Sequence, residues 1–269
     1  MHYLGLSATI NQKVLDDTFT QLSLEEEDVS IVAIPPDHPN IFLEVVKSSE
    51  YDLDSDLNWV FEKLKEEKTS YPKTIIFVQT INQASDLYEL ALDILEDDAY
   101  EQAPSSSSMD DGRLVSMYHG QIGDTLQRKT LHTFRQKDTS LRVIVSTIAF
   151  GMGVEIADIR QVIHWGRSKS MLSYWQEVGR GGRDGQQSHA WLYPKTVAGE
   201  EKELFEKVKE DTDFCIRAFI LRQFQLKAMD MSSVEQLDNE DKCTLKCDQC
   251  SCPSCVCCSN CKQTCPCST

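Results

Sequence analysis

The sequence predicts an α/β fold in which a parallel sheet is covered by helices on both faces and followed by a small helical metal-binding module. Two observations carry this prediction. Short apolar runs alternate with segments of helical periodicity between residues 57 and 193, and all 11 cysteines lie at or after residue 215. Strands that alternate with helices are joined by crossover connections, which bury a parallel sheet between two helical layers.

Strands are predicted where apolar runs have strand length, and helices where apolar residues recur three and four positions apart. The acidic, serine-rich segment 96–112 is expected to be a disordered surface insertion, because it has few apolar residues to bury. The predicted strands are Thr74–Val78, Leu114–Tyr118, Val143–Ser146, Val162–Trp165 and Ala190–Tyr193; the helical faces consist of Leu57, Val60, Phe61 and Leu64, of Ala84, Leu87, Ala91 and Leu95, and of Leu131 with Phe134.

The loop after the strand Val143–Ser146 has a composition suited to phosphate. The strand leads into Thr147 and then into a run of small residues that includes Gly151 and Gly153. Glycine has no Cβ, so backbone amides in such a loop can approach a phosphate closely.

A second feature of the same block is a pair of arginines beside a glutamine. A helix that begins near Ser170 would place Gln176 and Arg180 on one face and Arg183 at its glycine-rich end. Arginine is permanently charged and directs two donors at phosphate oxygens. The pair therefore suits stabilisation of the charge that develops during phosphoryl transfer.

The block resembles the RecQ-type ATP-dependent DNA helicases. STIAFGMGVEIADIRQVIHW is similar to the family's motif V and QEVGRGGRDG to its motif VI, while Ser7–Thr9, Lys73–Val78 and Tyr118–Gly120 resemble motif III, motif IV and the YHAGL stretch. The resemblance implies a division into residues 1–30 (a remnant of the first helicase lobe with its linker), 31–198 (the C-terminal RecA-like domain), 199–250 (a RecQ-like zinc-binding module) and 251–269 (a cysteine-rich tail).

The resemblance also implies roles for single residues. Arg180, Arg183 and Gln176 would be catalytic toward ATP with Mg²⁺. Three positions depart from the family pattern, since His38 and Ile81 stand where arginine is usual and Glu155 where aspartate is common. The implied nucleotide-binding residues are Gln176, Gly153, Glu155, Arg180 and Arg183, and the implied DNA-binding residues are Thr147, Gly151, His119 and Arg167.

Two motifs needed for ATP hydrolysis do not occur in the sequence. No G-x-x-x-x-G-K-[ST] is present, and no DExH-like quartet precedes Ser7. Without a phosphate-cradling loop and the acids that hold metal and activate water, the chain is not expected to hydrolyse ATP alone. We expect a first RecA-like lobe as a partner in cis or in trans, and Met1 to reflect a truncated gene model or a broken paralogue.

The formal net charge of −16 at pH 7 predicts weak binding to nucleic acid. The acidic residues are concentrated outside the motif block, however. From Arg142 to Asp184, basic residues exceed acidic ones by two, six against four. Contact with a single strand through backbone amides and hydroxyls is therefore still expected.

The cysteines predict a metal site. Cys215 lies on a predicted helical segment, and Cys243, Cys247 and Cys250 follow with short gaps; KCDQC resembles the family's CDNC. Four thiolates arranged in this way can surround a tetrahedral Zn²⁺. Zinc is favoured over disulfides because the chain is expected to be intracellular.

The tail 251–269 repeats cysteine densely, in the run CPSCVCCSNCKQTCPC. Three interpretations remain open: a metallothionein-like cluster, a disordered tail, and a frameshift or annotation artefact. We favour disorder without metal. The tail cysteines also compete with Cys243 as candidate ligands.

Two functions are compatible with these features. The first is the C-terminal portion of an ATP-dependent 3′-to-5′ DNA helicase that acts on single-stranded or forked DNA. The second is a non-catalytic, zinc-dependent nucleic-acid-binding or scaffold module. No run approaches the ~18 apolar residues of a membrane helix, so no membrane association is expected; the expected location is the nucleus in a eukaryote and otherwise the cytoplasm.

Overall fold

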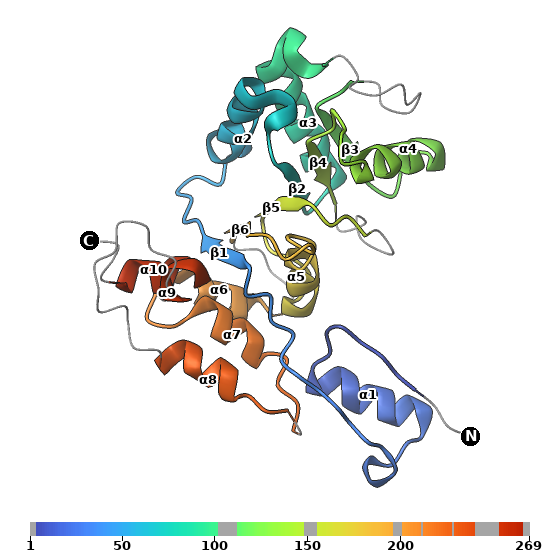
Figure 1. Ribbon diagram of the computed structural model, residues 1–269, viewed down its shortest axis with the longest axis vertical. Coiled ribbons are helices and arrows are strands. Elements are labelled where there is room, and N and C mark those ends of the chain that lie inside the picture. The colour runs from blue at the N-terminus through green and yellow to red at the C-terminus, as the bar shows by residue number, and fades with distance from the viewer. Residues whose placement is uncertain are drawn as a thin grey trace.

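The computed structural model describes residues 4–101, 112–147, 155–195, 201–210, 212–227, 229–239 and 253–265. It contains a six-stranded sheet with the order β1-β6-β5-β2-β4-β3, in which every pairing is parallel (Figure 1). This confirms the predicted sheet and adds β1 to it. The strands are β1 (Ile41–Val45), β2 (Lys73–Val78), β3 (Val115–Tyr118), β4 (Val143–Ser146), β5 (Ile159–Trp165) and β6 (Ser188–Tyr193).

Helices cover both faces of this sheet, as predicted. On one face lie α2 (Leu53–Glu67) and α3 (Ile81–Leu95), whose predicted apolar faces are fully buried. On the other face α4 (Asp124–Arg135) packs through Phe134, and α5 (Met171–Val178) packs beneath β1 and β6. Short 3₁₀ turns at residues 26–28, 68–70 and 96–99 complete this part of the chain, and residues 102–111 of the predicted insertion lie outside the described residues.

The C-terminal helices belong to the same hydrophobic core as β1, β6 and α5. They are α6 (Lys202–Glu210), α7 (Ile216–Arg222) and α8 (Ser232–Asn239), and they contribute Phe205, Ile220 and Val234 to that core. The sheet with α5 and the C-terminal helical module α6–α8 are therefore packed together through apolar contacts.

The expectation of a disordered tail is wrong for residues 253–265. These residues form α9 (Pro253–Cys257) and α10 (Ser259–Thr264), which lie along the outer edge of β1. Cys258 forms a β-bridge with Leu43, and the Ser259 hydroxyl accepts a hydrogen bond from the Val45 amide at 3.4 Å. The physical reason is that an uncovered edge strand leaves backbone donors and acceptors unpaired.

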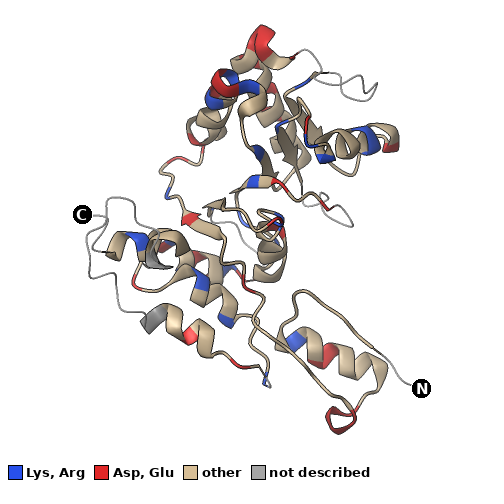
Figure 2. Ribbon diagram, in the orientation of Figure 1, with Lys and Arg blue, Asp and Glu red and all other residues tan. Residues whose placement is uncertain are grey.

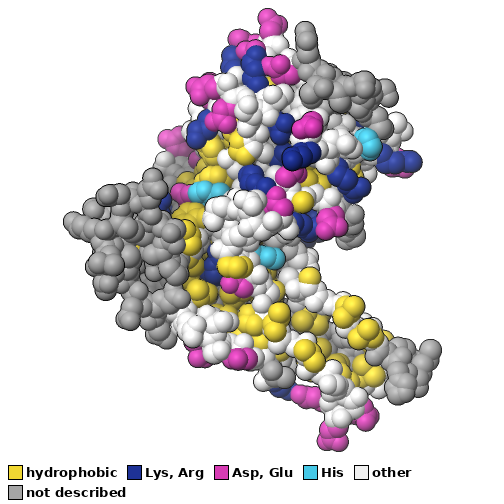
Figure 3. All heavy atoms as spheres, in the orientation of Figure 1, with side chains coloured by type: hydrophobic (Ala, Val, Ile, Leu, Met, Phe, Trp, Pro, Cys, Tyr) yellow, Lys and Arg dark blue, Asp and Glu magenta, His cyan; other side chains and the backbone are white. Residues whose placement is uncertain are grey.

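The N-terminal segment, residues 4–34, projects from the rest of the molecule, and we call it the arm. Its helix α1 (Gln12–Leu22) buries none of its residues, and the ribbon shows it apart from the sheet (Figure 1). The arm exposes large apolar side chains, which form much of the hydrophobic surface visible in Figure 3. The most exposed are Leu4, Leu6, Val32 and Ile34, each at 80% or more.

Candidate nucleotide-facing surface and thiol cluster

Helix α5 positions the predicted nucleotide contacts. It begins after Ser170, as the sequence predicted, and the Ser170 hydroxyl caps the helix by accepting from the Ser173 amide at 3.1 Å. One side of the helix is buried, and Gln176 lies on the opposite, exposed side. The helix thus presents Gln176 outward, where its amide donates to the Thr9 hydroxyl of the arm at 2.6 Å.

The loop after α5, residues 179–185, holds both arginines, and we call it the arginine loop. Burial lowers the pKa of Arg180, and the nearby charge of Arg183 lowers it further. Arg183 itself is exposed, with its Nε donating to the Gly179 carbonyl at 3.2 Å. Two neighbouring guanidinium groups, one of them partly desolvated, form a site where a bound anion would be strongly favoured.

Gly179 and Gly182 of the arginine loop are required by residues 36–41, which lead into β1 and pack against the loop; we call this segment the linker. The Asn40 amide donates to the carbonyls of Gly182 and Gln186, both at 2.8 Å. Gly182 has a φ of +59°, and a Cβ there would lie 2.4 Å from Asn40 Nδ2. A Cβ on Gly179 would lie 2.6 Å from His38 Nε2. The backbone of this loop is therefore set by the linker residues.

A buried polar cluster anchors α5 to the sheet. Glu177, on the inner side of the helix, accepts from the Ser168 hydroxyl at 2.6 Å and lies 2.9 Å from His164 Nε2 on β5. All three side chains are less than a tenth exposed. This cluster fixes the rotation of α5 and hence the direction of Gln176.

The predicted DNA-binding residues follow the carboxyl ends of strands, which meet at one edge of a parallel sheet. His119 follows β3, Thr147 follows β4 and Arg167 lies just beyond β5, so the first two are on adjacent strands. Thr147 is half-buried and its amide donates to the Tyr118 carbonyl at 3.3 Å. Gly151 lies outside the described residues.

His119 and Arg167 are held by backbone interactions at this edge. His119 is buried and its Nδ1 accepts from the Gln121 amide at 3.2 Å, which is a turn-forming contact. The Arg167 carbonyl accepts from the side-chain amide of Gln79 at 3.1 Å, while the Arg167 side chain is half-buried. Thr147 and Arg167 thus remain the accessible members of the predicted set.

The arginine loop lies at the opposite ends of the strands. The Gly182 amide donates to the Ile159 carbonyl at the start of β5, and the Asp184 amide to the Ala157 carbonyl. Glu155, which is exposed, lies two residues before Ala157. Glu155 is therefore brought near the arginines by the chain, while Gly153 lies outside the described residues.

The acidic charge lies mainly away from these surfaces. The 3₁₀ turns Glu26–Asp28 and Glu96–Ala99 carry three acidic residues each, and Figure 2 shows them at opposite extremities of the molecule. Surface charges farther apart than the ~8 Å Debye length are largely screened at physiological salt. The net negative charge of the chain therefore acts only weakly at the arginine loop.

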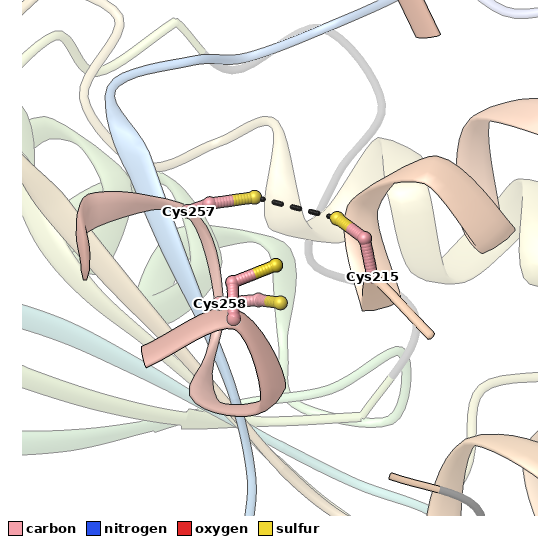
Figure 4. Close-up of side chains that lie close together, drawn as sticks. Cys215, Cys257 and Cys258 are labelled. Atoms are coloured by element: carbon pink, nitrogen blue, oxygen red, sulfur yellow. Dashed lines mark hydrogen bonds between the residues drawn. The ribbon is translucent and has the colours of Figure 1, made fainter. Parts of the chain in front are cut away.

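A cluster of four thiols joins the two ends of the C-terminal module. The sulfur atoms of Cys215, Cys257, Cys258 and Cys261 all lie within 4.8 Å of one another. Figure 4 shows Cys257 and Cys215 facing each other, with their sulfurs 3.5 Å apart. Cys215 precedes α7 and its sulfur accepts from the Ala218 amide at 3.5 Å. Hydrogen bonds from neighbouring thiols, first that of Cys215, lower the pKa of Cys258.

The residues of this cluster fit a tetrahedral metal ion. Zn–S bonds of ~2.3 Å place the sulfurs of a tetrahedral site ~3.8 Å apart, within the span of the cluster. Three of the four thiols are buried. Thiolates are the soft donors that Zn²⁺ and similar soft or borderline ions prefer.

The cluster differs from the predicted ligands in three of four members. Cys215 is common to both sets, whereas Cys243, Cys247 and Cys250 lie outside the described residues. The alternative, that tail cysteines compete as ligands, describes the observed geometry. Cys257, Cys258 and Cys261 also have short ligand-like spacing, but spacing alone could not rank two such groups.

The fold and the arginine loop together define a class of protein. Residues 57–185 match the family described as the helicase conserved C-terminal domain. This range contains the sheet core, α5 and both arginines. The chain therefore carries a helicase C-terminal domain.

The particular family follows from relatives that match most of the chain. Mouse bifunctional 3′-5′ exonuclease/ATP-dependent helicase WRN is 26% identical over 92% of this chain and 17% of that protein. Human ATP-dependent DNA helicase Q4 is 30% identical over 82% of this chain and 18% of its own length. Bacillus subtilis ATP-dependent DNA helicase RecQ is 28% identical over 84% of this chain and 37% of its own length. The helicase C-terminal domain of this chain thus resembles that of the RecQ DNA helicases over most of the chain, and the chain spans well under half of each of these relatives.

Solved structures agree with the fold. DEAD-box helicase Mss116 bound to ssRNA and UDP-BeF aligns with a TM-score of 0.56 at 16% identity, over 87% of this chain and 43% of that one. Saccharomyces cerevisiae Dbp5 bound to RNA and ADP BeF3 gives 0.54 at 17% identity, over 87% and 52%. The sheet is thus RecA-like. Among the described residues, no helix has the length and apolar character needed to cross a membrane.

Proposed function

We propose that this chain is the C-terminal portion of an ATP-dependent 3′-to-5′ DNA helicase of the RecQ type, incomplete for ATP hydrolysis by itself. The arginine loop is the observation that carries the proposal. Arg180 is held partly desolvated beside Arg183, and Gln176 faces outward one helical turn before them. This arrangement suits an oligophosphate supplied from outside the lobe.

In the proposed reaction, ATP with Mg²⁺ is held mainly by a first RecA-like lobe. Arg180 and Arg183 neutralise the charge that develops on the transferred phosphoryl group, and Gln176 orients the nucleotide. Gly153 and Glu155 belong to the same nucleotide face. Closure around ATP and reopening after hydrolysis move the DNA strand, which lies across Thr147, Gly151, His119 and Arg167 at the carboxyl edge of the sheet.

The exposed arm supports a first lobe as the partner. Apolar side chains such as Leu6 and Val32 are 88% and 95% exposed, which is costly unless another surface covers them. The Gln176–Thr9 hydrogen bond already joins the motif III segment to α5. A first lobe seated on the arm would bring its nucleotide to Gln176 and the arginine loop.

We propose Zn²⁺ as the ion of the thiol cluster, held by Cys215, Cys257, Cys258 and Cys261. When bound, the ion serves as a structural crosslink. Cys215 is the N-cap of α7, and the other three ligands belong to the segment along β1. The four cysteines thus join the module to the edge of the sheet. In a eukaryotic cell we propose a nuclear location, and otherwise a cytoplasmic one.

The proposal is tested by mixing the chain with a separately expressed first lobe of a RecQ relative. We expect DNA-stimulated ATPase activity that is lost in Arg183→Ala, because the loop would no longer neutralise the phosphoryl charge. Arg135→Ala, on the exposed end of α4, is the matched control and should retain activity. Equal activity in Arg183→Ala and wild type would exclude the assigned role.

The second candidate function is a zinc-dependent nucleic-acid-binding or scaffold module. It is favoured by the lack of a phosphate-cradling G-x-x-x-x-G-K-[ST] in the sequence. The same mixture discriminates the two. An inactive mixture of folded, metal-loaded proteins would favour the binding module.

A further inference from the structure

We infer that Arg217 is a positioning residue that couples the thiol cluster to the arginine loop through the linker. Arg217 lies on α7, two residues after the cluster member Cys215, and is 2% exposed. The inference rests on the proposed metal site. It goes beyond that site, because it predicts that metal occupancy controls the order of the nucleotide-facing arginines.

The guanidinium of Arg217 contacts both the cluster and the linker. On the cluster side, Nη2 donates to the Cys257 carbonyl at 3.3 Å. On the linker side, Nη1 contacts the Asp37 carboxylate at 2.8 Å and the His38 carbonyl at 2.7 Å, and Nη2 donates to the Ile41 carbonyl. One planar, buried side chain thus connects the metal-binding segment to the start of β1.

The linker in turn contacts the arginine loop. The His38 ring packs against Trp175 of α5, with ring centroids 5.5 Å apart and the planes tilted by 34°, and it lies against Gly179. The Trp175 indole donates to the Pro36 carbonyl at 2.5 Å, and Asn40 holds the Gly182 carbonyl. The path from Cys257 to Gly182 therefore consists of direct contacts, and the Arg217 side chain bonds to both the Cys257 carbonyl and the Asp37 carboxylate.

Arginine has the shape that this connection requires. Its planar fork can donate to several carbonyls at once, whereas a lysine ammonium acts as a single charged centre. A buried arginine whose carbonyl partners shift must lose some of these bonds, and unsatisfied buried donors are costly. Displacement of the Cys257 segment on metal loss is therefore transmitted to residues 37–41. Contiguity alone does not establish coupling, so the test must measure non-additivity.

The experiment measures amide hydrogen exchange in the arginine loop, with and without zinc, in the full chain. The Gly182 and Asp184 amides are suitable reporters because they donate to carbonyls outside the loop. In wild type, removal of zinc by a chelator should speed exchange at these amides by about tenfold. In Arg217→Gln with zinc bound, exchange should already be fast, and the chelator should add little.

The controls separate coupling from general destabilisation. Arg222→Gln, on an exposed turn of the same helix, should behave as wild type. Arg217→Lys should restore only part of the zinc effect, because it cannot maintain all the carbonyl contacts. If Arg217→Gln does not fold, Asp37→Asn tests the same connection by removing only the carboxylate charge, and it should weaken the zinc effect.

Each outcome decides the inference. If zinc protects the loop amides equally in wild type and Arg217→Gln, the coupling is overturned. If Arg217→Gln does not fold, equal protection in wild type and Asp37→Asn overturns it instead. Metal content and the spectrum of the Co²⁺-substituted chain report the metal site separately. A chain that binds no metal overturns the metal assignment and the coupling together, whereas a chain that binds metal without protecting the loop overturns the coupling alone. The helicase assignment is tested separately, by the ATPase experiment with a first lobe.

Discussion

Two glycines of the arginine loop give a matched test of how the linker shapes the nucleotide face. Gly182 and Gly185 both have positive φ, +59° and +80°. A Cβ on Gly182 would lie 2.4 Å from Asn40 Nδ2 and 2.6 Å from the Gln186 carbonyl oxygen, whereas a Cβ on Gly185 would meet nothing within 4 Å. The two alanine variants therefore share the backbone cost and differ in crowding.

The expected magnitudes follow from these contacts. A non-glycine residue in the left-handed region costs about 1 kcal/mol, which is the expected loss for Gly185→Ala. Gly182→Ala adds overpacking and displaces the Asn40 amide from its acceptors, for a total of about 3 kcal/mol. Urea unfolding of the metal-loaded chain, analysed at constant m, measures both free energies. Equal destabilisation by the two substitutions would show that Asn40 moves away from a Cβ at position 182 without cost, and would refute the reasoning.

Three further predictions concern other parts of the site. Burial lowers the pKa of His38 below its usual 6.5. As the pH falls, the unfolded chain therefore binds a proton at this histidine before the folded chain does, and the free energy of unfolding should decrease between pH 6.5 and the folded-state pKa. His38→Gln should remove this decrease when unfolding is measured at pH 7.5 and 5.5. Glu177→Ala should cost about 2 kcal/mol in urea unfolding, because it leaves His164 and Ser168 without their acceptor, and Glu177→Gln should recover at least half; no difference between them would contradict this. Cys258→Ser should abolish the tetrahedral Co²⁺ spectrum while Cys250→Ser keeps it, and the reverse would restore the ligands predicted from sequence.

The sheet could be predicted because its strands are buried on both faces. Ile75, Ile144 and Ile163 are central-strand residues with no exposed surface, so their surroundings are reflected directly in apolar runs. β1 was missed as a strand because it is at the edge, where its burial alternates and a following tail supplies the cover. The start of α5 near Ser170 was predicted correctly because helix boundaries depend on local residues, and the structure adds the Ser170 cap that fixes it.

The thiol cluster shows the limit of spacing arguments. Two groups of cysteines follow Cys215, and both have gaps short enough for a metal site. Among the described residues, Cys257, Cys258 and Cys261 reach Cys215 because residues 253–265 pack along the edge of β1. This packing is not encoded in the separation between cysteines.

By itself, the sequence determined the alternation of strands and helices, the start of α5 near Ser170, and Arg183 at the glycine-rich end of that helix, because these depend on local periodicity. The predicted helical position of Arg180 was wrong, because α5 ends at Val178 and Arg180 lies in the loop that follows. Only the tertiary structure decided which cysteines meet, that the linker dictates the arginine loop through Asn40 and His38, and that Arg217 is buried between linker and cluster. The physical reason is that these contacts join residues far apart in the chain. Their geometry follows from sheet order and packing, which no local pattern specifies.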